Sequence, residues 1–474
     1  MSDVCVFYAS EDRKVVALLV KLLEKRMTVW WDRRIDEGQW EKHVTQELRI
    51  AKLAIVVWSS VSIEKEIVLA EARRAIKRTK PLLMLRIEDV ELPLQVAERT
   101  CIDAFGWDGK NANDGVQELI EKAERIIDPR PERSPLSRPS RIEILGKEIL
   151  LPGFFRSVSS FETQVPPLAC LELLDWHEAK LVLVSAYDMI LADNRSAIYD
   201  VIRKMQKRGA FVIMDSGNYE AYRNHDFKTK SNKKGWSREK FASAITRVPF
   251  DFAFGFDDFK TGDDATKVVA DVIRRTRLDH DLDRTKLFCP IVHAPTSEEG
   301  VRLSDKLPEI VYGVAKELRP HVVAVPEREL GNGLIERAKA VRAIRTALDE
   351  LSWYQPLHLL GTGNPWSIAV LSAAGADLFD GLEWCRTVAS DENGVLYHFQ
   401  HYDLFRYQAR VAKSSATKLS VDNKKVPYAA RVALHNLEVF NNWMEKVQNH
   451  IRDGTAKTFL AQTLGKQFDL ELFK

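Results

Sequence analysis

The chain is poor in cysteine and has no long hydrophobic run. Its 474 residues include five cysteines, which are scattered and form no Cys-x-x-Cys pair. This spacing supports neither a disulfide framework nor a cysteine-rich zinc site. No apolar stretch approaches the ~20 residues that a transmembrane helix needs, and the N-terminal residues lack a signal-peptide pattern. We therefore expect a cytoplasmic protein without a membrane segment or a bound metal.

A strong charge of either sign is also absent. The 70 basic and 68 acidic residues leave a formal net charge of +2, which neither requires nor excludes a nucleic-acid partner. The hydrophobic fraction of 45% and the charged fraction of 29% are typical of a soluble globular protein. A chain of this length is longer than one domain with a single hydrophobic core usually is, so we expect two or three domains.

Residues 1–127 alternate between short apolar segments and amphipathic helical patterns. Strands are expected at 4–8, 28–31, 54–58 and 81–86. This alternation predicts a doubly wound parallel sheet in an α/β domain. The helix that follows the third of these strands carries Glu71 about one turn from its start. A carboxylate just beyond the carboxyl end of a parallel strand lies where open α/β sheets bind ligands, so Glu71 is a candidate catalytic group.

Three segments of this domain resemble the strand-loop motifs of TIR domains. They are FYASEDRK (7–14), VWWDRRIDEGQ (29–39) and WSSVSIEKEIVLAEA (58–72). Resemblance to the TIR domains that cleave NAD implies that NAD is the substrate and Glu71 the catalytic residue. A fixed carboxylate suits this chemistry, because it stabilises the oxocarbenium charge that forms as the nicotinamide-ribose bond breaks. Ile67 stands where this motif usually has an aromatic residue.

Several other side chains of the TIR-like domain are candidates for contact with NAD. They are Ser10, Trp31, Arg33, Arg34, Trp40 and Ser59. An aromatic ring offers a stacking surface and a guanidinium group binds phosphate. Two alternatives stay open: Glu71 is a solvated partner of Arg74, or the domain serves only for association with other TIR domains.

A proline-rich segment follows at 128–140. It reads DPRPERSPLSRPS, with four prolines and almost no apolar residue, so we expect a semi-rigid linker between domains. Its arginines are expected to keep an exposed linker soluble.

Residues 141–400 repeat the strand-helix pattern. Apolar strands are expected at 181–185, 210–214, 252–256, 287–292, 322–325, 357–360 and 378–379. Units repeated in this way predict a (β/α)8 barrel, which a helical extension follows over 401–474. Chemistry in such barrels gathers at the carboxyl ends of the strands. The side chains expected at these ends include Asp215, Asp257, His293, Glu327, Gly361 and Asp380.

The motifs at these strand ends resemble those of the tRNA-guanine transglycosylase family. They are MDSGNYEAY (214–222), GFDDF (255–259), IVHA (291–294), AVPE (324–327), HLLGTGNP (358–365) and AGADLFD (374–380). The resemblance implies that Asp380 is the nucleophile that attacks the ribose, that Asp215 acts as acid and base, and that Asp257 recognises the base. It further implies a base pocket lined by His293, Glu327 and Gly361.

The sequence also departs from the transglycosylase pattern. Asn218 replaces a glycine, His293 a glutamine and Pro326 a glycine, and the family's cysteine-rich zinc segment is missing. These changes predict a pocket with different dimensions and hydrogen bonding.

Fusion of the two domains indicates a bacterial anti-phage defence protein. In the leading hypothesis, the barrel binds DNA, tRNA or a purine-type ligand and controls NAD hydrolysis by self-associated TIR domains. In the alternative, the barrel exchanges guanine for a 7-deazapurine in a nucleic acid and the TIR domain recruits partners. In a third hypothesis, neither domain is an enzyme, and both serve only as binding modules for partner molecules. Lysines and aromatic residues near 222–236 and 407–428 are candidates for contact with nucleic acid.

Overall fold

The computed structural model describes two compact units, Met1–Pro131 and Glu132–Lys474, each of which has its own core. The described residues are 2–31, 47, 48, 50–77, 81–93, 96, 101–107, 112–127, 138–160, 163–219, 235–257, 262, 264–297 and 301–465. Among them, no helix combines the length and the apolar character that crossing a bilayer requires.

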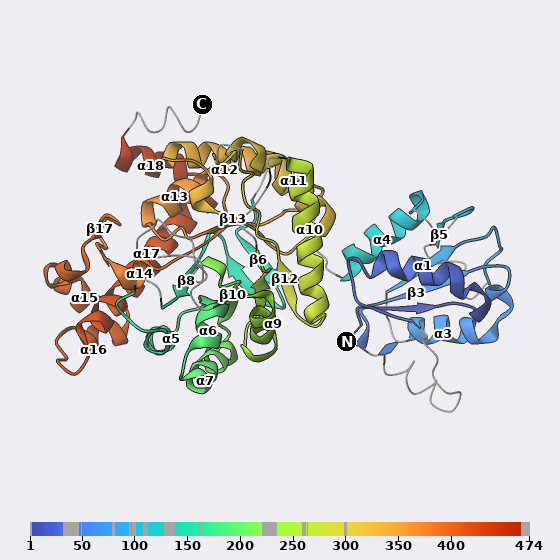
Figure 1. Ribbon diagram of the computed structural model, residues 1–474, viewed down its shortest axis with the longest axis horizontal. Coiled ribbons are helices and arrows are strands. Elements are labelled where there is room, and N and C mark those ends of the chain that lie inside the picture. Colours follow the sequence, from blue (N-terminus) through green and yellow to red (C-terminus); the bar gives the residue numbers. More distant parts are fainter. Residues whose placement is uncertain are drawn as a thin grey trace. The chain divides into compact units, whose positions relative to one another are not determined.

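The first unit contains a five-stranded parallel sheet of order β2-β1-β3-β4-β5. Its strands are β1 (Val4–Phe7), β2 (Val29–Trp30), β3 (Leu53–Trp58), β4 (Leu82–Arg86) and β5 (Cys101–Asp103). The central strand β3 is buried along its whole length, as expected for a strand covered on both faces. Helices α1 (Arg13–Leu23) and α4 (Asp114–Ile127) pack on one face, and α3 (Glu66–Lys77) packs on the other (Figure 1).

The second unit is a barrel of eight parallel strands in the order β12-β11-β10-β9-β8-β15-β14-β13. They are β8 (Gly153–Val158), β9 (Leu181–Ser185), β10 (Phe211–Asp215), β11 (Phe252–Phe254), β12 (Leu287–Cys289), β13 (Val323–Pro326), β14 (Leu357–Leu360) and β15 (Leu378–Gly381). Just after β12, the Val292 amide donates to Ala324 of β13 (2.8 Å), and the Ala324 amide donates to Pro290 (3.0 Å). These two bonds join the first and last strands of the sheet.

Helices surround the barrel, as Figure 1 shows. They are α5 (Pro167–Trp176), α6 (Ala186–Leu191), α7 (Arg195–Lys207), α9 (Arg238–Arg247), α10 (Ala265–Leu282), α11 (Leu307–Leu318), α12 (Leu334–Leu348) and α13 (Pro365–Ala374). An antiparallel hairpin, β6 (Arg141–Ile144) with β7 (Lys147–Leu150), precedes the first barrel strand. Its Ile144 and Ile149 belong to the interior core of the barrel.

Side chains alternate between the barrel interior and the helices. In β10, Phe211 and Ile213 belong to the interior core, whereas Val212 and Met214 pack against the helical shell. Because successive strand residues point to opposite faces, Asp215 at the end of β10 points inward. The same alternation turns inward four further side chains near the carboxyl ends of strands, namely Ser157, Ser185, His358 and Asp380.

Arg138, in the segment predicted as a linker, is bound to the barrel. Its Nε lies 2.8 Å from a carboxylate oxygen of the fully buried Asp377, and its Nη1 donates to the carbonyl of Ser372 (2.8 Å). Arg345 and Tyr354 contact the same carboxylate. The expectation that the linker arginines serve only solubility is therefore wrong for Arg138, which neutralises a buried charge.

The C-terminal part of the second unit packs on the barrel wall. The long helix α17 (Tyr428–Arg452) places Phe440 against Phe154 of β8, with ring centroids 5.1 Å apart. Three short helices and a two-stranded ladder precede α17, and α18 follows it: α14 (Glu383–Arg386), β16 (Val388–Ala389), β17 (Leu396–Tyr397), α15 (Arg406–Arg410), α16 (Ser415–Val421) and α18 (Ala456–Leu464).

The predicted fold class is confirmed in both units, with three elements added. The structure contains the seven expected barrel strands, and the strand missing from the prediction is β8. The prediction also omitted β5 at the sheet edge and the β6-β7 hairpin.

Candidate active site

Asp380, near the carboxyl end of β15, has hydrogen-bond partners at both carboxylate oxygens. One of its oxygens, Oδ1, accepts from the Gly361 amide (3.1 Å) and contacts His358 Nε2 (2.9 Å). Its other oxygen, Oδ2, accepts from the Ser157 hydroxyl at 3.0 Å. The three donors come from β8 and from β14 or the turn after it, so the carboxylate is held in one orientation by neighbouring strands.

Asp215 lies near two other carboxylates of the site. The pKa of Asp215 is raised to about 7 by burial and by the negative charges of Asp257 and Asp380. The amides of Ser216 and Gly217 oppose this rise without cancelling it. Asp215 is therefore close enough to Asp257 and Asp380 to interact with their charges, and its raised pKa makes it a candidate for proton transfer near neutral pH.

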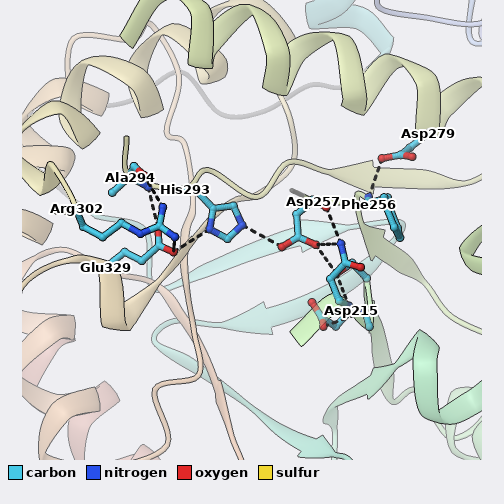
Figure 2. Close-up of polar contacts among 11 residues, drawn as sticks. Asp215, Phe256, Asp257, Asp279, His293, Ala294, Arg302 and Glu329 are labelled. Carbon is cyan, nitrogen blue, oxygen red and sulfur yellow. Dashed lines mark hydrogen bonds and ion pairs between the residues drawn. The ribbon is translucent and has the colours of Figure 1, made fainter. Parts of the chain in front are cut away.

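Asp257 forms a charged network with His293 and Glu329 (Figure 2). His293 places Nε2 3.0 Å from Asp257 and Nδ1 3.0 Å from Glu329. Burial opposes protonation of His293, but the two carboxylates raise its pKa to about 9. The imidazole is thus a buried cation with a carboxylate at each nitrogen.

The same network sets the charge of both acids. Burial acts to raise the pKa of Asp257, but hydrogen bonds from His293 and Ser216 bring it below its usual value. The pKa of Glu329 is likewise lowered, against burial, by His293 and Arg302. Asp257 is further fixed by Asn218, whose Nδ2 donates to its backbone oxygen at 2.6 Å. A cavity of about 240 Å³ borders Asp257 and His293.

The other two residues predicted for the base pocket, Glu327 and Gly361, make contacts outside the His293 network. Glu327 forms an ion pair with Arg337 at 2.8 Å. Within the described part of the chain, it makes no hydrogen bond to His293. The carboxylate that contacts His293 is Glu329, two residues later in the 3-10 turn η4 (Glu327–Glu329), and the role of Glu327 in a base pocket stays a prediction. Gly361 has a φ of +79°, which favours glycine, and its amide donates to Asp380.

Several polar atoms around these residues are buried and make no hydrogen bond within the described part of the chain. They are Ser185 Oγ, Asn218 Oδ1, Thr362 Oγ1, Glu383 Oε2 and His358 Nδ1. A buried polar atom without a partner is costly and is more common at binding sites than in a core. The first four follow strands of the barrel at their carboxyl ends, where a polar ligand or water would satisfy them.

In the first unit, Glu71 is buried in the face of α3 that packs on the sheet. It is only 4% exposed, beside Val68 and Ala72 on the same helix. The alternative that Glu71 is a solvated partner of Arg74 is therefore wrong as to solvation. Ile67, at the position where the motif usually has an aromatic ring, is 53% exposed.

The two sheet faces of the first unit separate the candidate aromatic contacts with NAD. Trp31 lies with Tyr8 on the sheet face covered by α1, whereas Trp30 packs with Phe7 on the face covered by α3. Trp31, the predicted contact, therefore lies on the sheet face opposite the helix that carries Glu71. Arg33, Arg34 and Trp40 lie outside the described residues.

The two candidate serines differ in how they are used. Ser59 is fully buried, and its hydroxyl donates to Asp12 at 2.6 Å and accepts from the Ser62 amide at 3.1 Å. It holds the turn after β3 together. Ser10 is exposed and its hydroxyl donates to Glu11 at 3.0 Å.

Comparison with known proteins identifies both units. Residues 136–469 match the family model described as queuine tRNA-ribosyltransferase, which is more than half of the chain. The chain belongs to the queuine tRNA-ribosyltransferase family. Residues 4–120 match the TIR domain. Both resemblances drawn from the sequence are confirmed.

Three archaeal relatives of this ribosyltransferase family carry the name tRNA-guanine(15) transglycosylase. The protein from Methanopyrus kandleri is 23% identical over 270 residues, which is 55% of this chain and 54% of the relative. Those from Aeropyrum pernix and Methanococcus vannielii are 28% and 30% identical over 130 and 106 residues, or 27% and 21% of this chain and 25% and 16% of the relatives. The chain thus spans about half or less of the length of these curated relatives.

Within this ribosyltransferase unit, the sequence motifs located the strand ends but not the supporting residues. Ser157, His358 and Glu329 contact Asp380 or His293 and were not predicted. The alternation of inward and outward side chains along a strand would have predicted that Ser157 and His358 face the barrel interior.

Among the described residues, no group of three or more His, Cys, Asp and Glu side chains is arranged to hold a metal ion.

Proposed function

We propose that the barrel transfers ribosyl groups between purine bases by two displacements on a covalent intermediate. The observation that carries this proposal is that two carboxyl groups with different surroundings occur in one site. Asp380 accepts from three donors, and the pKa of Asp215 is raised to about 7. A fixed carboxylate is suited to attack an anomeric carbon, and a nearby carboxyl group that titrates near neutral pH is suited to proton transfer. The purine donor is a nucleotide within a nucleic acid.

The two displacements divide the work between these carboxyl groups. Asp380 attacks C1′ of the ribose, the bond from C1′ to N9 breaks, and Asp215 protonates the departing purine. The entering purine then gives its N9 proton to Asp215 and attacks C1′, which releases Asp380. Two inversions at C1′ retain the sugar configuration.

Base recognition falls to the network around Asp257. Its carboxylate already accepts from Ser216 (2.6 Å) and Asn218 (3.1 Å) and contacts His293. These bonds fix the orientation of Asp257 and leave few acceptor positions for the N–H groups of a purine. Asn218 Oδ1, which has no hydrogen-bond partner in the part of the chain that the structure describes, is a further acceptor beside it.

Incorporation of labelled guanine tests this proposal. The full chain is incubated with labelled guanine and with bulk tRNA, single-stranded DNA or duplex DNA, and label retained by the nucleic acid is counted. We expect label in at least one nucleic acid and none when protein is omitted. If neither labelled guanine nor a labelled 7-deazapurine is incorporated into any of the three, base exchange is excluded.

A second activity is favoured by the burial of Glu71, and for this we propose hydrolysis of NAD at the nicotinamide-ribose bond. A carboxylate that is 4% exposed is removed from the screening of bulk water, so its charge acts strongly on an adjacent oxocarbenium ion. The barrel would then control this reaction by binding a nucleic acid or purine-type ligand, with association of TIR domains as the coupling step. Such control suits a bacterial anti-phage defence protein.

Replacing Glu71 with glutamine is expected to lower NAD cleavage by about 10²–10³-fold, because the side chain keeps its shape but loses its charge. Release of nicotinamide is measured with and without tRNA and DNA. The matched control is Glu66→Gln on the same helix, where the carboxylate is exposed and pairs with Arg73. Equal turnover by Glu71→Gln and wild type would remove Glu71 from the mechanism.

A further inference from the structure

The two oxygens of Asp380 have different surroundings. Oδ1 faces two N–H donors, the Gly361 amide at 3.1 Å and His358 Nε2 at 2.9 Å. Oδ2 accepts only from the Ser157 hydroxyl at 3.0 Å among the described residues. Because an ionised carboxylate only accepts hydrogen bonds, the proton of this contact lies on His358 Nε2.

His358 is placed for a single hydrogen bond. Its side chain is fully buried in the barrel, with the rings of Phe155 and Phe254 centred 5.8 and 5.2 Å away. Its Nδ1 has no hydrogen-bond partner in the described chain. An apolar side chain would fill this aromatic surrounding without burying an unpartnered nitrogen, so the role of the histidine lies in its Nε2–H.

We propose that His358 is a positioning residue that, together with the Gly361 amide, makes Oδ2 the attacking oxygen and Oδ1 the oxygen that carries charge when Asp380 is released. This inference rests on the proposed ribosyl transfer. Oδ2 has the fewer donors and therefore forms the bond to C1′. In the resulting ester, Oδ1 becomes the carbonyl oxygen and still faces both N–H groups.

The two donors favour the second displacement. In that step the N9 atom of the entering purine bonds to C1′, and its proton passes to Asp215. The bond from C1′ to Oδ2 breaks, and its electron pair returns to the carboxylate. Hydrogen bonds to a charged carboxylate are stronger than those to a neutral ester carbonyl, so His358 stabilises free Asp380 more than the intermediate. Loss of this donor should therefore shift the balance toward the covalent intermediate.

The test compares His358→Phe with His358→Gln in the full chain. Phenylalanine keeps the aromatic packing and removes the donor, whereas glutamine keeps an N–H donor in a similar position. Each protein is mixed with bulk tRNA or single-stranded DNA, denatured, and resolved on a gel that separates free protein from the protein-nucleic acid adduct. We expect the ratio of adduct to free protein to rise by about tenfold or more in His358→Phe and to stay within about twofold of wild type in His358→Gln.

The possible outcomes separate this inference from the proposed function. A fall in adduct with His358→Phe, in a protein that unfolds at the wild-type temperature, would overturn the role of His358 and leave ribosyl transfer standing. No adduct in wild type with any nucleic acid would instead contradict ribosyl transfer. An NMR spectrum of wild type labelled with ¹⁵N-histidine shows which ring nitrogen of His358 carries the proton, and this measurement does not depend on activity. The His358 signal is assigned as the one that is missing in His358→Gln. A proton on Nδ1 but not on Nε2 would overturn the arrangement.

Discussion

Replacing Asp380 with asparagine is expected to abolish base exchange, with a loss of about 10⁴-fold or more, and to remove the covalent adduct. The amide has nearly the shape of the carboxylate and still accepts hydrogen bonds from Gly361 and His358. It lacks the charge and the nucleophilic oxygen on which both displacements depend. Removal of a nucleophile in other covalent mechanisms has effects of this size. The measurements are incorporation of labelled guanine and the adduct on a denaturing gel.

The control for this substitution is Asp422→Asn. Asp422 is an exposed acid paired with Arg410 at 3.1 Å, so its loss is expected to change exchange by less than about twofold. Thermal unfolding of both variants shows whether the loss of activity reflects chemistry or folding. Exchange by Asp380→Asn at the wild-type rate would assign the nucleophile to another group.

The motifs located the candidate carboxylates of the barrel because they mark the carboxyl ends of its strands. A short apolar run that ends in a polar residue or a glycine marks a strand and its carboxyl end, where (β/α)8 barrels gather their chemistry. Asp215 and Asp380 were predicted from their places at strand ends and from the family motifs, and both point into the barrel. The missed strand β8 shows the limit of this signal. Arg156 interrupts its apolar run, yet the side chain is buried and bonded to the Phe154 carbonyl and to Asn441.

The network around His293 was harder to predict, because it depends on contacts between separate strands. The AVPE motif predicted Glu327 as a residue of the base pocket, which stays a prediction, whereas the carboxylate that contacts the imidazole is Glu329 in the 3-10 turn after β13. A difference of two residues changes which carboxylate is buried. No spacing in the sequence distinguishes them, since the choice is made by the path of the backbone beside Ala294, whose amide donates to Glu329 at 2.8 Å.

The first unit gives a similar lesson for adjacent aromatic residues. The sequence shows that Trp30 and Trp31 point to opposite faces of a strand, but not which face each takes. That is decided by which helix covers each face, and here α3 with Glu71 covers the face of Trp30. Trp30 is therefore the better candidate for a ring near Glu71.

Replacing Asp215 with asparagine is expected to lower base exchange by about 10²–10⁴-fold and to raise stability at alkaline pH. The rate falls because the departing purine loses its proton donor. In wild type the pKa of Asp215 is about 7 in the folded protein, compared with an ordinary value of 3.8. Between these values the folded state binds more protons than the unfolded state, so its stability decreases as the pH rises. Wild-type exchange should likewise fall above pH of about 7, as Asp215 ionises.

Thermal unfolding of wild type and Asp215→Asn at several pH values measures this effect. The stability of the variant relative to wild type is expected to increase from about pH 4 to about pH 7 and to stay constant above that range. Asp279, whose pKa is raised to about 7 mainly by burial, is present in both proteins, so its contribution cancels in the comparison. A difference between the two unfolding temperatures that does not change with pH would contradict the raised pKa of Asp215. A slower but more stable variant would show that the charge clustered at this site is kept for chemistry at a cost in stability.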